Sequence, residues 1–261
     1  MDIVVCIKQV PDTTDVKVDP ETKTLVRDGV RSTLNPFDAF AIEEALRLKE
    51  SAGGSVTALT MGPPQARAVL EEALAMGVDH AALLSHRAFA GSDTLATSYA
   101  LSQAIRKFGR FDVVVCGKQA ADGDTAQVGP GIAVRLEIPQ VIFASGVKEV
   151  HKGRLFVERI TEEGHELVSV PLPCLISVVK EANVPRYPSF SGKVRAKRAD
   201  IPVWGPDDIG CDPGRIGLDG SPTWVDRIFA PPVKEGCEPV QATDANVADV
   251  ARRVVDHIEG R

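Results

Sequence analysis

The sequence predicts an α/β protein with a doubly wound, mostly parallel sheet, and three observations support this fold class. Apolar runs of strand length alternate with stretches of helical periodicity over residues 1–145. A polar, glycine-rich turn follows the apolar run that ends at Cys116 and precedes a helical stretch, which is typical of nucleotide sites in open α/β sheets. The 261 residues are 44% hydrophobic and 25% charged, which suits one large domain or one domain plus an extension.

The strands expected in this part are apolar runs bounded by glycine, proline or polar residues: Ile3–Val10, Ser55–Met61, His80–Ser85, Phe111–Cys116 and Gln140–Ser145. A long loop with two short β-like pieces, VKV and TLV, follows the first of them. Loops of this length at the mouth of a sheet are often functional. The alternation of strands and helices predicts right-handed crossovers between parallel neighbours.

The first expected helix begins at a strong signal, with Asn35 as N-cap, Pro36 at the first helical position and Asp38 able to reach back. Its periodicity places Ala41, Ala45 and Leu48 toward the core and predicts that four polar residues face water: Glu43, Glu44, Arg47 and Lys49. Further helices are expected at Gln65–Met76, from Ser92 or Asp93 to about Phe108, and at Ile132–Leu136.

The pattern changes after Ser145. A hairpin centred on Lys152-Gly153, a strand at 165–170 and a buried strand at 174–180 predict a small antiparallel addition. From Asn183 the chain loses periodicity until a short helix at Ala245–Ile258. We therefore expect an α/β domain at 1–183 and an extended C-terminal arm at 184–261, which must pack on the domain or on another chain because it lacks a core of its own.

Composition argues against several functions. The net charge of −6 disfavours a general nucleic-acid role. The chain opens directly into a strand, with no signal peptide and no apolar run near the roughly 20 residues of a membrane helix, so a cytoplasmic protein without membrane insertion is expected. The five cysteines are far apart and the histidines lack metal spacing, so neither a disulfide framework nor a metal site is expected.

Familiar catalytic motifs are also missing: GxxxxGK[ST], GxGxxG and GxSxG do not occur at the positions where they would act. The polar loops are typical of ligand holding rather than bond making. Asp122 and Asp124 could accept from ribose hydroxyls, coordinate magnesium or form a solvated acidic turn. Thr125 and Gln127 could donate to phosphate oxygens or cap a helix, so an ordinary βα turn stays open as an interpretation.

A proline- and serine-rich stretch carries a second candidate surface. Phe190 there is either tucked inward or an exposed anchor for a partner. A basic run follows, which is either a solvated strand or loop or a docking surface for an acidic partner: Lys193, Arg195, Lys197 and Arg198.

Several segments together identify a family. The chain resembles the small (beta) subunit of electron-transfer flavoproteins over about residues 1–210, with the terminal helix also expected. The matching segments, in the family's order, are VVCIKQVPD, LNPFDAFAIEEALRLKE, LTMGPPQA, ALAMGVD, DVVVCGKQAADGDTAQVGPGIAVRL, IPQVIFAS and PRYPSF…KVRAKRAD. One segment alone would be weak evidence, whereas the whole set is highly specific.

The resemblance implies an adenine-nucleotide alpha-hydrolase-like fold and a heterodimer with a larger alpha subunit that holds the redox FAD near the interface. The beta subunit itself would carry AMP or a second FAD, and would have no catalytic residues of its own. The nucleotide-site positions carry over onto Cys6, Asn35, Pro36, Phe37, Asp38, Met61, Asp122, Gly123, Asp124, Thr125, Ala126, Gln127, Val128, Gly129, Pro130, Gly131, Ile132 and Ala133.

The same resemblance implies a recognition loop for acyl-CoA dehydrogenases or similar flavoproteins. Its expected residues are Arg186, Tyr187, Pro188, Ser189 and Phe190, followed by the basic run. Phe190 stands where ordinary members place an aliphatic anchor, which leaves the dehydrogenase open.

A second departure concerns the branch of the family. Ordinary aerobic members have an aromatic residue in the loop after the first strand, where this chain reads Pro11-Asp12-Thr13-Thr14. The segments VDPETKTLVRDGV, followed by NPFD, and DGDTAQVGP resemble the bifurcating and nitrogen-fixation-linked branch. In that branch the beta-site FAD is reduced by NADH and passes single electrons to different acceptors, including ferredoxin or flavodoxin. The alternatives are a non-bifurcating member with AMP, an ATP-using hydrolase or ligase of similar fold, and a nucleotide-sensing stress-type module.

Overall fold

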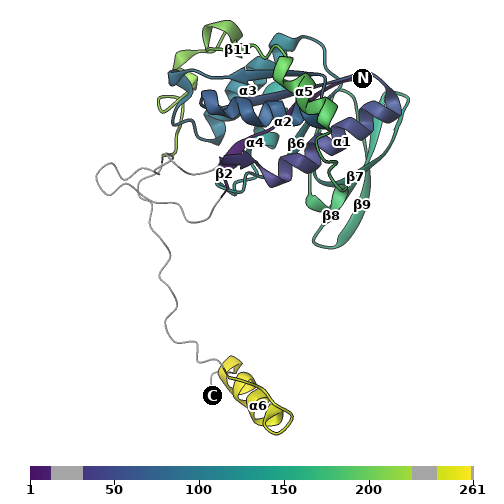
Figure 1. Ribbon diagram of the computed structural model, residues 1–261, viewed down its shortest axis with the longest axis vertical. Coiled ribbons are helices and arrows are strands. Elements are labelled where there is room, and N and C mark those ends of the chain that lie inside the picture. The colour runs from purple at the N-terminus through teal and green to yellow at the C-terminus, as the bar shows by residue number, and fades with distance from the viewer. Residues whose placement is uncertain (13–31, 225–239, 260–261) are drawn as a thin grey trace. The chain divides into compact units, whose positions relative to one another are not determined.

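The computed structural model describes residues 1–12, 32–224 and 240–259, which form parts of two units, Met1–Asp226 and Arg227–Arg261 (Figure 1). The first unit contains a nine-stranded sheet in the order β11-β5-β4-β1-β6-β10-β7-β8-β9. The strands from β11 to β7 are parallel, whereas β8 and β9 are antiparallel additions at one edge. The sequence therefore predicted the fold class correctly.

The strands of this sheet are β1 (Asp2–Cys6), β4 (Ser55–Met61), β5 (His80–Leu84), β6 (Val113–Gly117), β7 (Gln140–His151), β8 (Arg154–Thr161), β9 (Gly164–Pro171), β10 (Cys174–Val178) and β11 (Val203–Trp204). A separate two-stranded sheet pairs β2 (Gln9–Pro11) with β3 (Ser32–Leu34). The helices of this unit are α1 (Pro36–Ala52), α2 (Arg67–Met76), α3 (Thr94–Phe108), α4 (Val128–Leu136) and α5 (Phe190–Arg198).

Two layers of helices cover the parallel sheet. Ile3 and Val5 of β1 pack with α1 and α2 on one face, and Val4 and Cys6 pack with α3 and α4 on the other. This alternation follows from the two-residue period of a strand, and the continuous apolar runs follow from burial on both faces. After α1 and α2 the chain builds β4 and β5 on one side of β1, and then crosses to place β6 on the other side. In open α/β sheets, ligands bind at the carboxyl ends of the two strands between which the chain changes side, and here these strands are β1 and β6.

Some elements differ from the expected boundaries. The first strand stops at Cys6, and the chain re-forms a strand at Gln9–Pro11 in the small sheet. The expected VKV and TLV pieces lie at 16–18 and 24–26, outside the described residues. Strand β7 continues to His151 because its second half pairs with β8 in the hairpin.

The expectation that Glu43 and Glu44 face water is wrong. They are 6% and 2% exposed, because segments 103 and 143 residues further along the chain fold onto this side of α1. The backbone N–H of Val147 donates to Glu44 at 2.7 Å, and Arg186 binds Glu43. Helical periodicity could not reveal these partners, since both come from outside the helix.

The expectation of an irregular chain, strand or loop around the basic run is also wrong, because residues 190–198 form α5. The Ser189 side chain accepts from the backbone N–H of Gly192 and so caps the helix. Helix α5 packs beside α2 (Figure 1). Gly192 and Ala196 are its buried positions, and the small side of the helix lets it lie close to α2.

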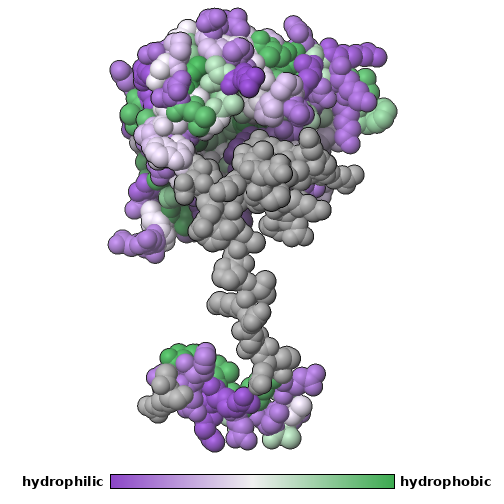
Figure 2. Space-filling model, turned by 90° about the vertical axis from the view of Figure 1, so that its left-hand side faces the viewer, coloured by the Kyte–Doolittle hydropathy of each residue, from purple (hydrophilic) through white to green (hydrophobic). Residues whose placement is uncertain are grey.

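The second unit contains α6 (Val247–Ile258). Its apolar side chains gather on one side and its charged ones on the other, as green and purple atoms show in Figure 2. Over the described residues of both units, no helix has the length and apolar character that a membrane crossing requires.

Candidate nucleotide-binding site

The expected nucleotide-site residues lie at the carboxyl edge of the sheet, on three neighbouring strands and two helix starts. Cys6 ends β1, Met61 ends β4, and the loop after β6 carries residues 118–127. The strands are direct neighbours: Cys6 is in register with both Leu59 and Cys116. We call the predicted nucleotide-site residues the carboxyl-edge cluster: Cys6, 35–38, Met61 and 122–133.

Asn35 ties the start of α1 to the loop after β6. It occupies the N-cap position but makes no capping bond with its side chain. Its amide instead donates to the Gln119 carbonyl oxygen at 2.9 Å and accepts from the Ala121 N–H at 3.1 Å. Asn35 is 1% exposed, and both ends of its amide are satisfied by one loop. The residue predicted as a helix cap therefore joins two segments of the site.

Asp38 is buried beneath the same junction. Its Oδ2 accepts from the Lys8 N–H at 2.7 Å, directly after β1. Burial raises the pKa of Asp38 from 3.8 to about 7, against the lowering effect of hydrogen bonds from Asn35, Lys8 and Gly117 and of the Lys8 charge. Gly117 leaves the space that Asp38 occupies, because a Cβ there would overlap Oδ1.

The loop after β6 is fixed by side-chain contacts at Asp122 and Asp124, and its backbone is strained at Asp124 and Ala126. The Lys8 ammonium lies 2.6 Å from Oδ1 of Asp122, and the Gln119 amide donates to Asp124. The backbone is left-handed at Asp124 (φ 53°) and Ala126 (φ 54°), a conformation that non-glycine residues adopt rarely. Such strain persists where the surroundings impose it, and it is common in ligand-binding loops.

Helix α4 begins at Val128, four residues before the predicted start. Gln127 is the residue before the helix and makes no capping bond, so neither Asp124 nor Thr125 caps it. Within the described chain, the N–H groups of Val128 and Gly129 donate to no acceptor. Uncapped amides at a helix start favour an anion, which suits the phosphate part of a nucleotide.

Two thiols line the base of this edge. Cys6 and Cys116 face each other in register on β1 and β6. A hydrogen bond to Cys6, together with burial and the nearby Asp38 carboxylate, raises the pKa of Cys116. A thiol held in its protonated form is a weak nucleophile, so Cys116 packs at this edge of the sheet rather than reacting there.

The predicted partner-recognition residues lie in residues 184–190, which we call the recognition segment, and in α5. Tyr187 and Phe190 are 95% and 85% exposed. Arg186 points the other way and binds Glu43 and Glu50 of α1. Phe190 is therefore an exposed side chain rather than one tucked inward.

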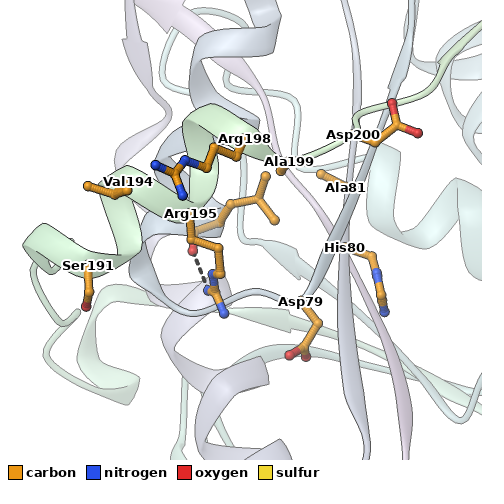
Figure 3. Close-up of a pocket in the computed structure, with 10 residues that line it drawn as sticks. Asp79, His80, Ala81, Ser191, Val194, Arg195, Arg198, Ala199 and Asp200 are labelled. Atoms are coloured by element: carbon orange, nitrogen blue, oxygen red, sulfur yellow. Dashed lines mark hydrogen bonds between the residues drawn. The ribbon is translucent and has the colours of Figure 1, made fainter.

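The basic run does not act as one group. Arg195 donates to the Leu74 carbonyl oxygen at 2.7 Å, the dashed line in Figure 3, and to that of Val78 at 3.2 Å, both near the end of α2. The side chains of Lys193, Lys197 and Arg198 form no hydrogen bond or ion pair within the described residues. The positive charge offered to solvent on α5 therefore comes chiefly from these three.

Two cavities, of about 600 and 510 Å³, lie at the opposite, amino edge of the sheet. The first, drawn in Figure 3, lies between α5 and the start of β5 and is lined by Arg195, Arg198 and His80 among others. Neither is lined by a residue of the carboxyl-edge cluster. The nucleotide site is argued instead from the chemistry of the carboxyl edge, where ligands of open α/β sheets bind.

The predicted set of site residues leaves out Lys8, Gln119 and Gly117, although Gly117 and Gln119 belong to the polar turn after Cys116 that the sequence singles out. Lys8 and Gln119 stand two residues beyond the ends of β1 and β6, where side chains of neighbouring parallel strands meet. That position was the available signal for them. For Gly117 a further signal was its place as a glycine at a strand end, which can mark a close approach.

A mostly parallel α/β sheet with polar loops at its carboxyl edge is the architecture of the nucleotide-binding class of domains. A family model described as "Electron transfer flavoprotein domain" matches residues 22–209. The electron transfer flavoprotein subunit beta of Thermoanaerobacterium thermosaccharolyticum is 48% identical over 262 residues, covering 100% of this chain and 99% of the relative. The chain belongs to the electron transfer flavoprotein family, as a beta subunit.

Two further relatives carry more particular names. The caffeyl-CoA reductase-Etf complex subunit CarD of Acetobacterium woodii is 49% identical over 260 residues, covering 99% of this chain and 98% of the relative. Protein FixA of Sinorhizobium fredii is 46% identical over 266 residues, covering 99% and 93%. Beta subunits of this family pair with an alpha subunit and act in electron transfer with flavin.

Proposed function

We propose that this beta subunit binds an adenine nucleotide at the carboxyl-edge cluster while its alpha partner holds the FAD that both subunits share. The observation that supports this most directly is the mutual bonding of Lys8, Asn35 and the loop after β6. These contacts join the start of α1, the end of β1 and the loop that leads from β6 to α4. Two helix starts and a strained polar loop then face the same edge.

The residues of the carboxyl-edge cluster have distinct roles in this proposal. The amides of Val128 and Gly129 and the side chains of Thr125 and Gln127 bind the phosphates. Cys6 and Met61, at the apolar strand ends, hold the adenine. Asp122 or Asp124 accepts from the ribose. The flavin supplies the redox chemistry, and the chain binds, orients and shields it.

We assign the nucleotide of this subunit as a second FAD rather than AMP, with NADH as its reductant and single electrons passed to different acceptors. The residues Pro11-Asp12-Thr13-Thr14 include no aromatic residue, as in the bifurcating branch that the sequence resembles. The similarity to proteins named FixA and to a subunit of a caffeyl-CoA reductase-Etf complex supports the same branch. Acceptors would include ferredoxin or flavodoxin.

The test is to purify the chain with the alpha subunit encoded beside it, reconstitute with excess FAD and identify the released nucleotides. Two FAD per heterodimer and bleaching of the visible spectrum by NADH are the expected results. One FAD and one AMP per heterodimer, with no bleaching, would leave the electron carrier in place and overturn the bifurcating assignment. A heterodimer without any adenine nucleotide in the beta subunit would overturn the site.

The recognition segment and α5 are proposed to dock an acyl-CoA dehydrogenase or a similar flavoprotein. Phe190 and Tyr187 offer two large exposed rings, and three unpaired cations flank them on α5. Aromatic anchors bordered by charge are typical of docking sites, where the anchors give affinity and the charges speed encounter. Residues beyond the first unit, including α6, are proposed to pack on the alpha subunit, since α6 has an apolar side without a core of its own.

A further inference from the structure

The recognition segment is held in place by side-chain contacts rather than by backbone hydrogen bonds. Residues 183–188 belong to no helix or strand, and within the described chain they make no backbone–backbone hydrogen bond. Val184 and Tyr187 are exposed on either side of Arg186. The segment is therefore ordered by side-chain contacts to α1 and by the fixed φ angles of Pro185 and Pro188.

Arg186 supplies most of those contacts. Its guanidinium donates to Glu43 Oε2 at 2.8 Å and Oε1 at 2.9 Å, and to Glu50 Oε1 at 2.6 Å and Oε2 at 3.2 Å. Its backbone N–H also donates to Glu43 at 3.1 Å. Glu43 and Glu50 lie seven positions apart, two turns along one face of α1. One planar cation thus bridges two carboxylates and fixes the backbone directly before Tyr187, the first of the two exposed aromatic residues.

A second contact fixes the start of the segment. The Asn183 amide donates to the Phe40 carbonyl oxygen at 3.0 Å and to Glu44 at 2.9 Å. Arg186 also determines the ionisation of its partners: burial would raise the pKa of Glu43, but the hydrogen bonds and charge of Arg186 lower it. Hydrogen bonding to Arg186 likewise lowers the pKa of Glu50. Both carboxylates are thereby kept in the charged form that binds Arg186.

Stability alone is a weak reason for such an arrangement. Glu50 is exposed, and exposed ion pairs contribute little to stability. Desolvating Glu43 offsets much of the attraction that it gains. What the arrangement does achieve is a fixed backbone beneath Tyr187 and Phe190, so these anchors need not be ordered when a partner binds.

We propose that Arg186 is a positioning residue for partner docking, which through Glu43 and Glu50 holds the recognition segment in its binding conformation before the partner arrives. The proposal rests on the docking role given to this segment above. Arg186 itself faces α1, so it acts on the partner through Tyr187 and Phe190. The partner surface that fits is an apolar pocket bordered by carboxylates, complementary to Phe190 and to Lys193 and Lys197.

The experiment uses the reconstituted heterodimer and an acyl-CoA dehydrogenase of the source organism as the probe. Four beta-subunit variants are compared: Arg186→Gln, Arg186→Lys, Phe190→Ala and Arg159→Gln. Arg159 is the matched control, because it pairs with Glu166 at 2.7 Å on the β8–β9 hairpin and does not touch the segment. The measured quantities are the KM of the dehydrogenase for the heterodimer, kcat, and the rate of chymotrypsin cleavage after Phe190.

We expect Arg186→Gln to raise KM about tenfold, since freeing roughly one residue of backbone corresponds to a factor of that size. The change in kcat should be smaller than the change in KM, and cleavage after Phe190 should be faster. Arg186→Lys should give a KM between those of the unaltered heterodimer and Arg186→Gln, because an ammonium keeps the charge but not the bridging geometry. Arg159→Gln should match the unaltered heterodimer.

Two results separate the proposals. If Phe190→Ala raises KM and Arg186→Gln does not, docking stands and the positioning role is overturned. If neither raises KM, the docking proposal fails and the positioning role falls with it. Should Arg186→Gln fail to assemble, Glu50→Gln removes only the exposed half of the bridge, and it must raise KM and the cleavage rate in the same direction for the proposal to hold.

Discussion

The Nζ of Lys8 lies 2.6 Å from Oδ1 of Asp122, which stands 114 residues later in the chain. The backbone N–H of the same lysine donates to Asp38 at the start of α1. Lys8 therefore joins the end of β1 to both the first helix and the loop after β6. A single residue that follows a central strand thus connects three of the four segments proposed to hold the nucleotide; the end of β4, with Met61, is the exception.

Lys8→Met should weaken nucleotide binding more than it destabilises the fold. The ion pair is partly exposed, so its loss should lower the free energy of unfolding by no more than about 1 kcal/mol. Removing a positive charge from the proposed phosphate edge, and releasing the loop that carries Asp122, should increase the Kd several-fold. Isothermal titration of the nucleotide-stripped heterodimer measures this change.

Lys49→Met is the matched control for that experiment. Lys49 also forms a 2.6 Å ion pair, with Asp79, but away from the carboxyl-edge cluster. Lys49→Met should lower the free energy of unfolding by a similar amount and leave the Kd for the nucleotide unchanged. An equal rise in Kd for both variants would show that Lys8 affects binding only through general destabilisation.

The buried Asp38 should make stability fall as pH rises toward neutrality. Burial raises its folded-state pKa from 3.8 to about 7, so between these values the folded chain holds a proton that the unfolded chain has lost. The free energy of unfolding then decreases with pH, with a limiting slope of about 1.4 kcal/mol per pH unit from this group. Asp38→Asn, which imitates the neutral carboxyl, should lack this component.

Urea unfolding of the wild-type protein and of Asp38→Asn, at several pH values between 4 and 8, tests whether Asp38 makes stability fall with pH. The stability of wild type minus that of the Asn variant should decline through this window. A difference that increases with pH would mean that Asp38 is ionised and stabilised by Lys8 and Asn35.

Gly131→Ala should disturb the packing of α4 on α3. A Cβ at this position would lie 2.7 Å from Ser98 Oγ and 2.8 Å from Ser98 Cβ, which is closer than such atoms approach. The helices must separate slightly, at an expected cost of about 1–3 kcal/mol. Gly123→Ala is the control, since nothing lies within 4 Å of its Cβ, and it should change stability by under about 0.5 kcal/mol. Equal thermal shifts for the two would contradict the close packing.

Local patterns in the sequence predicted the elements whose determinants are local. Strand β4 has the predicted bounds, and Asp93 caps α3 as expected, because an apolar run and a capping side chain act within a few residues. The same logic failed for Asn35, whose side chain bonds a distant loop instead of its own helix. It also failed for Glu43 and Glu44, since their partners are brought by tertiary folding.

The position of the candidate site was predictable, but its internal bonding was not. The carboxyl edge follows from the order of strands and helices. The Lys8–Asp122 pair depends on the register of β1 against β6, which only tertiary pairing sets. Helix α5 was not predicted because the glycine, serine and proline residues in and around it are typical of loops. Its packing on α2, which the local sequence does not reveal, stabilises it.

The basic residues of α5 should divide into two functional groups. Arg195 donates to two carbonyl oxygens at the end of α2, where a cation also meets the negative end of the helix dipole. Arg195→Gln should therefore lower stability by about 1–2 kcal/mol. Lys197→Gln should leave stability nearly unchanged but slow docking of the dehydrogenase at low salt. Stopped-flow association at several salt concentrations, with thermal unfolding alongside, separates the two effects; a stability loss for Lys197→Gln as large as that for Arg195→Gln would contradict it.

Helix α6 should be required for assembly with the alpha subunit. Val247, Val254 and Ile258 lie on one side of the helix at spacings of seven and four, and each is more than half exposed. An isolated helix of 12 residues is marginal in water, so α6 needs a surface on which to bury this side.

Val254→Asp places a charge in the middle of that apolar side, where burial against the alpha subunit would carry a large desolvation cost. We expect the Kd of the heterodimer to rise at least tenfold, measured by analytical ultracentrifugation. Arg253→Asp introduces the same side chain on the polar side and should change the Kd much less. Because both variants have the same helix propensity at the new residue, a difference between them reports the apolar face itself, and equal affinities would mean that α6 binds the alpha subunit through its charges or not at all.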